Sequence, residues 1–348
     1  MALAGSKKYQ EDLKRTLNNC DFLFLKGKKI FVTGGLGLIG SSIVDLLLEL
    51  NDILDANITI YIGDLEEAHF QEKYPVKRPD LSFLQYNSLS GFNYPFNFDF
   101  VIVAAGIANP QKYVSNPVET IMTSIQGLRD LLESGKNQPN TKYLYISSSE
   151  VYGRGKREPS EEREQLIFDI NDIRSSYAIG KLACEALSKS YSKEFGEKIV
   201  IARPGHIFGP TASIHDTRIS SSFCYDGVRK KPIILKTPGN SVRSYMYSLD
   251  CASAMLFLLQ KGSSGEIYNI ATKEKTSILD FAKYVSEAAS VPLFFEKPSE
   301  EDRKTFNSME NSTLEAKKLF SLGFKESFAV KEAVKHTIDI LAETLLQS

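Results

Sequence analysis

The chain has 348 residues, 42% of them hydrophobic, and a formal net charge of -1. This length supplies apolar material for one large or two merged globular domains, and the near-neutral charge argues against a nucleic-acid partner. No segment is apolar for long enough to span a bilayer, and residues 1–6 lack the profile of a signal peptide. We therefore expect a soluble cytoplasmic protein without a membrane partner. The spacing of the cysteines predicts neither a disulfide framework nor a metal site: Cys20, Cys184, Cys224 and Cys251.

An amphipathic helix is predicted within residues 7–25, ahead of a glycine-rich turn. The turn, T-G-G-L-G-L-I-G, lies between a buried strand, Ile30 to Val32, and a segment of helical periodicity from Leu38 to Leu50. In that setting glycines let the backbone approach a pyrophosphate at the helix N-terminus. The alternative is a tight turn without a ligand. The residues predicted to bind a dinucleotide here are Gly34, Gly37, Leu38, Ile39 and Gly40.

The second strand, Ile58 to Ile62, is followed by Asp64. An acidic side chain at this position accepts hydrogen bonds from both ribose hydroxyls and repels a 2′-phosphate. No arginine is adjacent to it, so we expect NAD rather than NADP; the alternative is a plain surface aspartate.

Two further strands, Leu81 to Tyr86 and Phe100 to Val103, end in polar or small residues. We expect the two polar residues after the first strand to line the adenine. The three small residues after the second strand either let the chain run beneath the cofactor or serve packing alone. These residues are Asn87 and Ser88, and then Ala104, Ala105 and Gly106.

A helix from Pro117 to Glu133 carries a broad apolar face. The width of this face is consistent with a subunit interface, which would make the protein a homodimer, and equally with core burial. The residues of the face are Val118, Ile121, Met122, Ile125, Leu128 and Leu132.

The fifth strand, Tyr143 to Ile146, leads into the hydroxyl-rich segment S-S-S-E-V-Y-G. A later helix carries Tyr177 and Lys181, which are four residues apart and so share one face. Lys181 as a cation favours the ionised phenol of Tyr177, and Ser148 can hydrogen-bond the reacting oxygen. Together these residues predict a proton-transfer device, provided that a dinucleotide fold surrounds them.

The sixth strand, Lys198 to Ala202, completes an alternation of strands and helices that predicts an α/β fold with a Rossmann-type doubly wound parallel sheet. After Pro210, short strands (Ile233 to Leu235, Ile267 to Ile270) and helices near Ile278 and Phe328 indicate a smaller C-terminal α/β lobe. We divide the chain into an N-terminal extension (1–25), a dinucleotide-binding domain (26–210 plus part of 211–275) and a mainly substrate-binding lobe (about 211–348). The substrate cleft is expected at the carboxyl ends of the strands.

From Lys28 to Leu341 the chain resembles the extended short-chain dehydrogenase/reductase family, in its nucleotide-sugar epimerase, dehydratase and decarboxylase branch. The resemblance is carried by T-G-G-L-G-L-I-G, Y-A-I-G-K, G-N-S-V-R-S-Y-M-Y-S-L-D and G-E-I-Y-N-I-A. It implies NAD as cofactor and a nucleotide-sugar substrate whose diphosphate is held by Arg243. We also assign Pro204 to cofactor binding and Arg218 to substrate binding.

Within this branch, Ser149-Glu150 resembles the UDP-glucuronate decarboxylases, which place Ser-Glu after the hydroxyl residue. The segment N-P-Q-K-Y-V-S-N-P-V-E-T is similar too, and makes Tyr113 the substrate-facing tyrosine. Two positions depart from the pattern. His206 replaces the usual asparagine and brings a charge that varies with pH. Met309 stands near the place of an arginine that pairs with the sugar carboxylate; either Arg303, several residues earlier with Lys304, reaches in, or no carboxylate is recognised.

The resemblance implies an NAD-dependent enzyme acting through a 4-keto intermediate, similar to UDP-glucuronate decarboxylase. Tyr177 would take the proton of the sugar C4 hydroxyl, Lys181 would lower its pKa and hold the nicotinamide ribose, and Ser148 would fix the C4 oxygen. Tyr177 and Lys181 are therefore assigned to cofactor binding as well as to catalysis. Glu150 would then assist as base or polar partner. A 4-epimerase, a 4,6-dehydratase or a 4-keto reductase remain alternatives within the fold. A non-catalytic NAD-binding sensor or scaffold is the alternative of another class, against which the intact proton relay argues.

Overall fold

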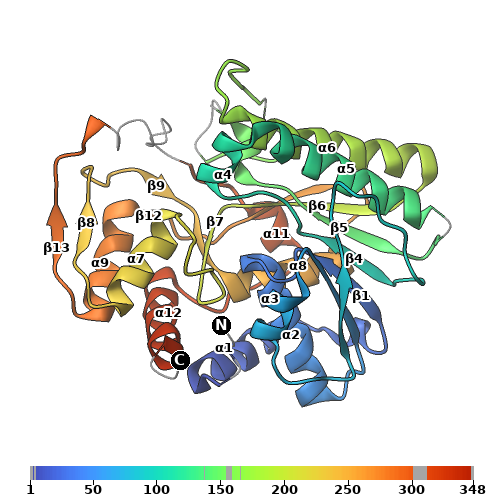
Figure 1. Ribbon diagram of the computed structural model, residues 1–348, viewed down its shortest axis with the longest axis horizontal. Helices are drawn as coiled ribbons and strands as arrows, with labels where there is room; N and C mark the ends of the chain where they lie inside the picture. The colour runs from blue at the N-terminus through green and yellow to red at the C-terminus, as the bar shows by residue number, and fades with distance from the viewer. Residues whose placement is uncertain are drawn as a thin grey trace.

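A seven-stranded parallel sheet lies at the centre of the computed structural model, which describes residues 3, 5–136, 138–153, 159–164, 166–300 and 312–345 (Figure 1). The strand order is β11-β6-β5-β4-β1-β2-β3. From the neighbouring strands β1 and β4 the chain winds outward in both directions, which confirms the predicted doubly wound sheet. In sheets of this kind, ligands bind at the carboxyl ends of the strands where the order reverses. The strands are β1 (Lys29–Thr33), β2 (Thr59–Asp64), β3 (Leu81–Gln85), β4 (Phe100–Val103), β5 (Lys142–Ile146), β6 (Lys198–Pro204) and β11 (Ile267–Ile270).

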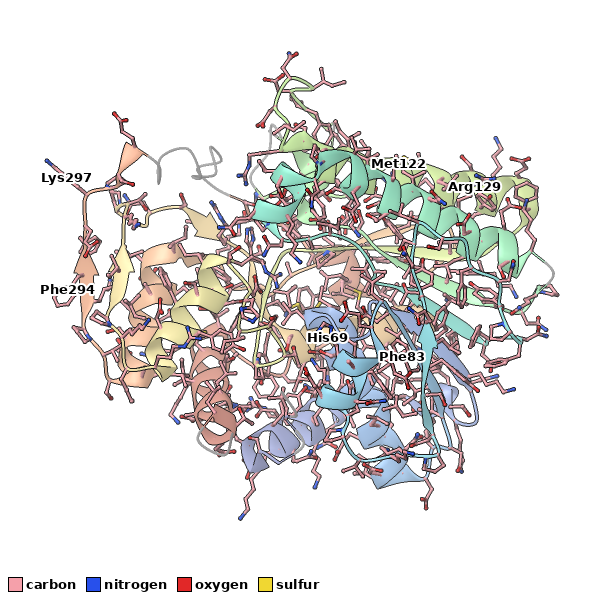
Figure 2. All side chains as sticks on the ribbon, in the orientation of Figure 1. His69, Phe83, Met122, Arg129, Phe294 and Lys297 are labelled. Carbon is pink, nitrogen blue, oxygen red and sulfur yellow. The ribbon has the colours of Figure 1, made fainter. Side chains whose placement is uncertain are left out.

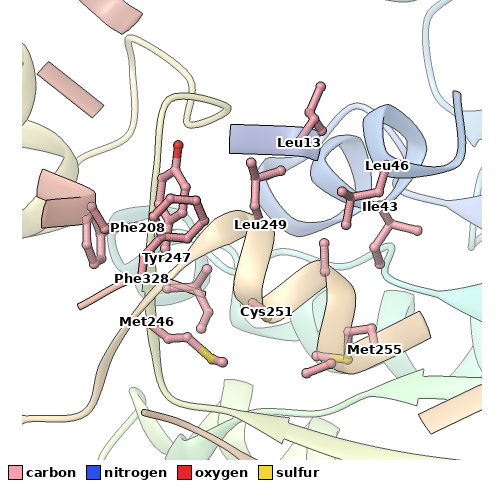
Figure 3. Packing of buried hydrophobic residues seen from close by; sticks show 14 of the residues in the cluster. Leu13, Ile43, Leu46, Phe208, Met246, Tyr247, Leu249, Cys251, Met255 and Phe328 are labelled. Carbon is pink, nitrogen blue, oxygen red and sulfur yellow. The ribbon is translucent and has the colours of Figure 1, made fainter. Parts of the chain in front are cut away.

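Helices cover both faces of the sheet because alternate residues of its buried strands point to opposite sides. In β1, Ile30 and Val32 join one hydrophobic cluster, whereas Phe31 joins the other. Figure 3 shows part of the first cluster, where Ile43 and Leu46 face a later helix. The helices of the first face are α2 (Leu38–Leu54) and α8 (Ser248–Lys261), and those of the second are α5 (Pro117–Gly135) and α6 (Ser175–Phe195).

A smaller group of elements lies beside the sheet, at the left of Figure 1. Its strands form three two-stranded sheets: β7 (His206–Phe208) with β10 (Tyr245–Tyr247), β9 (Val242–Arg243) with β12 (Thr276–Ser277), and β8 (Ile233–Leu235) with β13 (Leu293–Phe295). Its helices are α7 (Ile219–Val228), α9 (Ile278–Ala289) and α12 (Val330–Leu345), while the short α11 (Lys317–Ser321) lies against β11.

One strand predicted for the smaller lobe belongs to the main sheet instead. Residues 267–270 form β11, which pairs in parallel with β6 at the edge of the seven strands. The crossover helix α8 packs against α2 and so returns the chain to the open edge of β6. The prediction for this strand was wrong because its I-Y-N-I pattern marks a buried strand without indicating which sheet it joins.

The N-terminal helix α1 (Lys7–Leu17) is shorter than the predicted range, and a single 3₁₀ turn, η1 (Leu23–Leu25), follows it. Its buried face carries polar groups as well as apolar ones. Tyr9 Oη donates to Asp45 of α2 at 2.7 Å, whereas Asp12 lies 2.9 Å from the Nδ1 atom of His336 in α12. Tyr247 Oη also donates to Asp12, at 2.9 Å. Helix α1 therefore joins α2 to the smaller group of elements.

Within the described ranges, no helix combines the length and apolarity that crossing a membrane requires. The same residues contain no group of three or more His, Cys, Asp or Glu side chains placed to hold a metal ion. All four cysteines are free, and three of them are buried. The polar side chains that were predicted to be functional lie near the carboxyl ends of the central strands.

Candidate active site

The glycine-rich turn joins β1 to α2 in a conformation that only small residues allow. Gly34 has a φ of +64°, and a Cβ atom there would lie 2.8 Å from the backbone of Ala105. A Cβ atom on Gly40 would lie 2.2 Å from the carbonyl oxygen of Gly34. Helix α2 begins after Gly37, so the amides of its first turn, including Leu38 and Ile39, have no partners within the helix. The turn fits a pyrophosphate at a helix N-terminus.

Asp64 ends β2 beside this turn, and both of its carboxylate oxygens accept backbone N–H groups. Leu36 donates to Oδ2 at 3.3 Å and Leu65 donates to Oδ1 at 2.8 Å. A cation that sequence reasoning missed lies close by: Lys73, at the end of α3 (Glu67–Lys73), donates to Ser41 Oγ at 2.8 Å. Burial lowers the pKa of Lys73, against the opposing effect of Asp45 and Asp64.

The other residues assigned to the cofactor occupy neighbouring strand ends. Ala105 donates its N–H to Thr33 Oγ1 at 3.3 Å, and a Cβ atom on Gly106 would lie 3.7 Å from Lys181 Nζ. Ser88 is held against α5, because its hydroxyl donates to Tyr86 Oη at 3.4 Å and its side chain packs on Gly127. The remaining three are Ala104 after β4, Asn87, whose side chain accepts the N–H of Leu89, and Pro204, the buried last residue of β6.

Two tyrosines and a serine meet where β5 ends. Ser148 caps the 3₁₀ turn η2 (Ser149–Tyr152), its Oγ accepting the N–H of Glu150 at 3.1 Å. Tyr177, in the first turn of α6, stacks on Tyr113 of α4 (Pro110–Ser115) with ring centroids 5.1 Å apart and planes 10° from parallel. Lys181 lies one helical turn further, where its Nζ donates to the carbonyl of Ile146 at 2.8 Å. The structure thus brings the predicted relay residues to one strand end.

The charge states of the relay differ from the prediction. Burial, followed by the carboxylate of Glu150, raises the pKa of Tyr177 to about 12, against the opposing effects of the Ser148 hydroxyl and Arg218. Burial also lowers the pKa of Lys181 to about 8. The prediction of a lowered pKa for Tyr177 was therefore wrong: its phenol is protonated at neutral pH, because burial and Glu150 outweigh the Ser148 hydroxyl and Arg218.

Glu150 shares a phenol with an arginine that sequence reasoning also missed. Tyr113 Oη donates to Glu150 Oε1 at 3.5 Å and accepts from Arg174 Nη2 at 3.3 Å. Burial raises the pKa of Glu150, whereas Arg174 and the Tyr113 hydroxyl act to lower it. Burial, and then Glu150, raises the pKa of Tyr113. A carboxyl group whose pKa depends on its burial and on the neighbouring Arg174 and Tyr113 therefore lies next to the stacked tyrosines.

A second polar cluster forms between β7 and β10. His206 Nδ1 and Tyr245 Oη are buried, and neither has a hydrogen-bond partner in the described part of the chain. Their rings lie 5.8 Å apart. Burial, then Arg243 and Arg218, lowers the pKa of His206 to about 3, so the imidazole is neutral at physiological pH and the predicted variation of its charge there was wrong.

The two arginines of this cluster are differently held. Arg243, in β9, is buried and donates to the Val242 carbonyl at 2.9 Å. Arg218 precedes α7 and pairs with Asp216, its Nε lying 2.9 Å from Oδ2. Ser149 is buried within η2. Arg303, Lys304 and Met309 lie outside the described residues.

A third group of buried polar residues, which was not predicted from the sequence, lies next to the relay residues. Glu185 accepts Arg203 Nε at 2.9 Å and Nη2 at 2.6 Å, and it also accepts the Ser147 hydroxyl at 2.5 Å. Arg203 lies over the ring of Tyr152, whose hydroxyl donates to Asn269 at 2.7 Å. These buried contacts tie α6 to β5, β6 and β11. Glu185 follows Lys181 by four residues, which is the one sequence signal that could have placed it on the inner face of the helix.

The sequence model of the NAD dependent epimerase/dehydratase family matches residues 30–271. Among curated proteins, UDP-glucuronic acid decarboxylase 2 of Arabidopsis thaliana is 28% identical over 280 residues, which cover 80% of this chain and 61% of that protein. The dTDP-D-glucose 4,6-dehydratase of Dictyostelium discoideum is 30% identical over 282 residues, covering 77% of this chain and 63% of that protein. The chain thus spans about three fifths of the length of these curated relatives.

Solved structures share the fold. The UDP-N-acetylglucosamine 4-epimerase of Methanobrevibacter ruminantium, in complex with UDP-N-acetylmuramic acid, gives a TM-score of 0.77 at 22% identity, covering 92% of this chain and 99% of that chain. The UDP-glucose 4-epimerase of Thermus thermophilus, in complex with NAD, gives 0.73 at 23% identity, covering 90% and 98%. At these identities the likeness establishes the fold.

Proposed function

The chain belongs to the NAD dependent epimerase/dehydratase family, and we propose that it converts a nucleotide sugar through a 4-keto intermediate, as a UDP-glucuronate decarboxylase-like enzyme. The observation that carries this proposal is the position of Glu150, which shares the Tyr113 phenol with Arg174 and lies beside the relay of Ser148 and Tyr177. A relay alone serves simple oxidation or reduction. A carboxyl group next to it adds a group able to handle a proton at the carbon beside the ketone.

The proposed role of Tyr177 is to take the proton of the sugar C4 hydroxyl as a phenolate, after its own proton has passed to solvent, while Ser148 holds the C4 oxygen. Lys181 lies beneath them with its ammonium on the Ile146 carbonyl. NAD, when bound, supplies the hydride acceptor and donor for C4. We assign its pyrophosphate to Gly34, Gly37 and the first turn of α2, and its adenosine ribose to Asp64.

The ketone at C4 makes a carboxylate on C5 a leaving group. The C5–C6 bond breaks, its electron pair is drawn toward the C4 oxygen, carbon dioxide departs, and C5 takes up a proton. The proposed donor of that proton is the Tyr113 hydroxyl, which then regains a proton from solvent through the Glu150 carboxylate hydrogen-bonded to it. Return of the hydride to C4 makes the whole reaction redox neutral.

The nucleotide diphosphate is assigned to the cluster between β7 and β10. Arg243 and Arg218 supply the positive charge, and His206 Nδ1 and Tyr245 Oη supply buried polar atoms that the described chain leaves without partners. Buried polar groups normally find a partner, so these two atoms favour a bound ligand. Ser149 and Arg303 complete the assigned substrate residues, the latter from outside the described residues.

We further propose a homodimer that forms through α5 and lies in the cytoplasm. Val118 is 74% exposed and Met122 is 43% exposed on this helix, and Figure 2 shows Met122 on its outer surface. Exposed apolar side chains on a helix that already packs against α6 are consistent with a second copy. Four free cysteines are consistent with a reducing compartment.

The test is to incubate the protein with a panel of nucleotide sugars and follow the product mass. The proposal expects UDP-glucuronate to lose carbon dioxide. Loss of water from a hexose would indicate a 4,6-dehydratase, a new isomer of unchanged mass an epimerase, and gain of two hydrogens by a 4-keto sugar a reductase. Bound NAD without turnover of any nucleotide sugar would favour a sensor or scaffold.

A further inference from the structure

Arg174 is a half-buried arginine at the entrance to the relay helix, three residues before Tyr177. Its Nη2 donates to Tyr113 Oη at 3.3 Å, and its guanidinium lies 5.8 Å from the centre of the Tyr113 ring. Within the described residues no carboxylate oxygen lies within ion-pair distance of it. Arg174 occupies the N-cap position of α6, but its side chain makes no capping hydrogen bond. The side chain is therefore not needed to begin the helix.

One consequence of this contact concerns the position of Tyr113. Its ring lies parallel to that of Tyr177 at 5.1 Å, so any rotation of Tyr113 would change the packing on one face of Tyr177. The hydrogen bond from Arg174 restrains the far end of the Tyr113 side chain. Ser176 adds a weaker restraint at the backbone, where its hydroxyl lies 3.5 Å from the Tyr113 carbonyl. Arg174 thus helps to fix both stacked rings.

The other consequence concerns the charge of Glu150. Among the described residues, three charged or titratable side chains face this carboxyl: Tyr113 from α4, Tyr177 from α6, and Arg174, which immediately precedes α6. Burial raises the pKa of Glu150, and the guanidinium is the positive charge that opposes it. A guanidinium keeps its charge throughout the range in which proteins are stable. Of these three groups, the two phenols are neutral, and Arg174 carries the permanent positive charge next to Glu150.

We propose that Arg174 is a positioning residue that favours the ionised form of Glu150 and holds Tyr113 in place beside the relay. The guanidinium acts through the shared phenol, from Arg174 to Tyr113 to Glu150. The proposal rests on the proposed function only in taking Glu150 as a proton-handling group of the reaction. The proposal explains why the Arg174 guanidinium lies near the Glu150 carboxylate without forming a direct ion pair with it.

The kinetic test compares the pH profiles of kcat for the wild type, Arg174→Gln and Arg174→Lys, using a nucleotide sugar that the wild type turns over. An opposite charge nearby lowers a carboxyl pKa by about 1 to 3 units, so Arg174→Gln should move the acid limb of the profile upward by about 1 pH unit. Its kcat on that limb falls by about tenfold and recovers at alkaline pH. Arg174→Lys restores most of the wild-type profile, because the positive charge is kept.

The matched control is Arg229→Gln, which removes an exposed arginine at the end of α7 and leaves the profile unchanged. A uniform loss of kcat at every pH in Arg174→Gln, without movement of the acid limb, would overturn the charge-setting role. So would a loss seen with a uronate substrate and absent with a neutral sugar, because Arg174 would then bind the substrate carboxylate. An unchanged kcat in Arg174→Gln would overturn the proposal entirely.

A second measurement needs no substrate, so it separates failure of this inference from failure of the proposed function. Burial of Glu150 means that stability is lost as the pH rises from the ordinary pKa of a glutamate toward its raised pKa in the fold. Removing Arg174 raises that pKa further. Arg174→Gln should therefore lower the melting temperature more at pH 8 than at pH 5, by about 1 to 2 °C.

The same substitution made in a Glu150→Gln background should show no such difference between the two pH values, because the titrating carboxyl is gone. An equal loss in both backgrounds would show that Arg174 acts on the fold and not on Glu150. If no nucleotide sugar is turned over while the difference between the backgrounds is present, the proposed function fails and the link between Arg174 and Glu150 stands.

Discussion

Two buried polar clusters lie near the ends of β5, β6 and β7, and they differ in how their polar atoms are satisfied. The closed cluster consists of Ser147, Tyr152, Glu185, Arg203 and Asn269, each joined to another member by a hydrogen bond or, for Arg203 and Tyr152, a cation–π contact. The open cluster consists of His206, Arg218, Arg243 and Tyr245, and it includes two buried atoms without partners among the described residues.

We interpret the closed cluster as structural and propose that the open cluster binds the substrate. In the closed cluster the desolvation of Glu185 is offset by two bonds from Arg203, so the protein itself satisfies the charge. In the open cluster, the burial of His206 Nδ1 and Tyr245 Oη costs free energy that no described residue offsets. The proposed substrate would offset that cost, so the two clusters should respond to substitution in opposite ways.

The largest effect is expected in the closed cluster. Arg203→Met leaves Glu185 as a buried, uncompensated charge and should lower the free energy of unfolding by about 3–5 kcal/mol. Urea denaturation followed by circular dichroism measures it. The double variant Glu185→Leu with Arg203→Met removes both charges and should recover most of the loss. A double variant as unstable as the single one would contradict the view that this cluster is held together by its charges.

A pH effect of intermediate size is expected in the open cluster. The pKa of His206 falls from about 6.5 to about 3 on folding, so its contribution to stability is full above pH 6.5 and is lost as the pH falls toward 3. Between pH 7 and pH 5 this amounts to about 1–2 kcal/mol. His206→Phe should lose less stability than the wild type over that interval. An identical pH dependence in both proteins would place the titrating group elsewhere.

A smaller effect distinguishes binding from folding at the same residue. His206→Phe at pH 7.5 removes an unpartnered polar atom and should leave the free energy of unfolding within about 1 kcal/mol of the wild type. The KM for the nucleotide sugar should rise by about tenfold, corresponding to one lost hydrogen bond. Tyr245→Phe is the companion variant that keeps the ring. Normal KM values in both variants would show that the open cluster does not bind substrate.

The smallest effect concerns the proposed dimer, outside both clusters. Met122→Glu places a charge on the exposed face of α5 and should halve the mass measured by light scattering, with little change in the unfolding of each chain. Thr123→Glu, at a neighbouring and only partly exposed position, is the control for an added charge on the same helix. A wild type that is monomeric at every concentration would remove this part of the proposal.

The sequence was sufficient where function depends on local spacing. The turn from Gly34 to Gly40, and Tyr177 with Lys181 four residues later, could be predicted because neighbours along a chain fix their own geometry. Lys73, Arg174 and the pair of Glu185 and Arg203 could not. Their partners come from elements far apart in sequence, and only the folded sheet brings them together. Burial likewise reversed the expected direction of the Tyr177 pKa, because the sequence does not reveal how deeply a phenol is covered.

The most direct test of the proposed function uses UDP-glucuronate labelled with ¹³C at C6, with NAD present. The wild type should release labelled carbon dioxide, Tyr177→Phe should be slower by about 10²–10⁴-fold, and Glu150→Gln should also lose turnover while both variants still bind NAD. Release at the wild-type rate by Tyr177→Phe, or intact substrate and no labelled gas with every protein, would contradict the proposed decarboxylation.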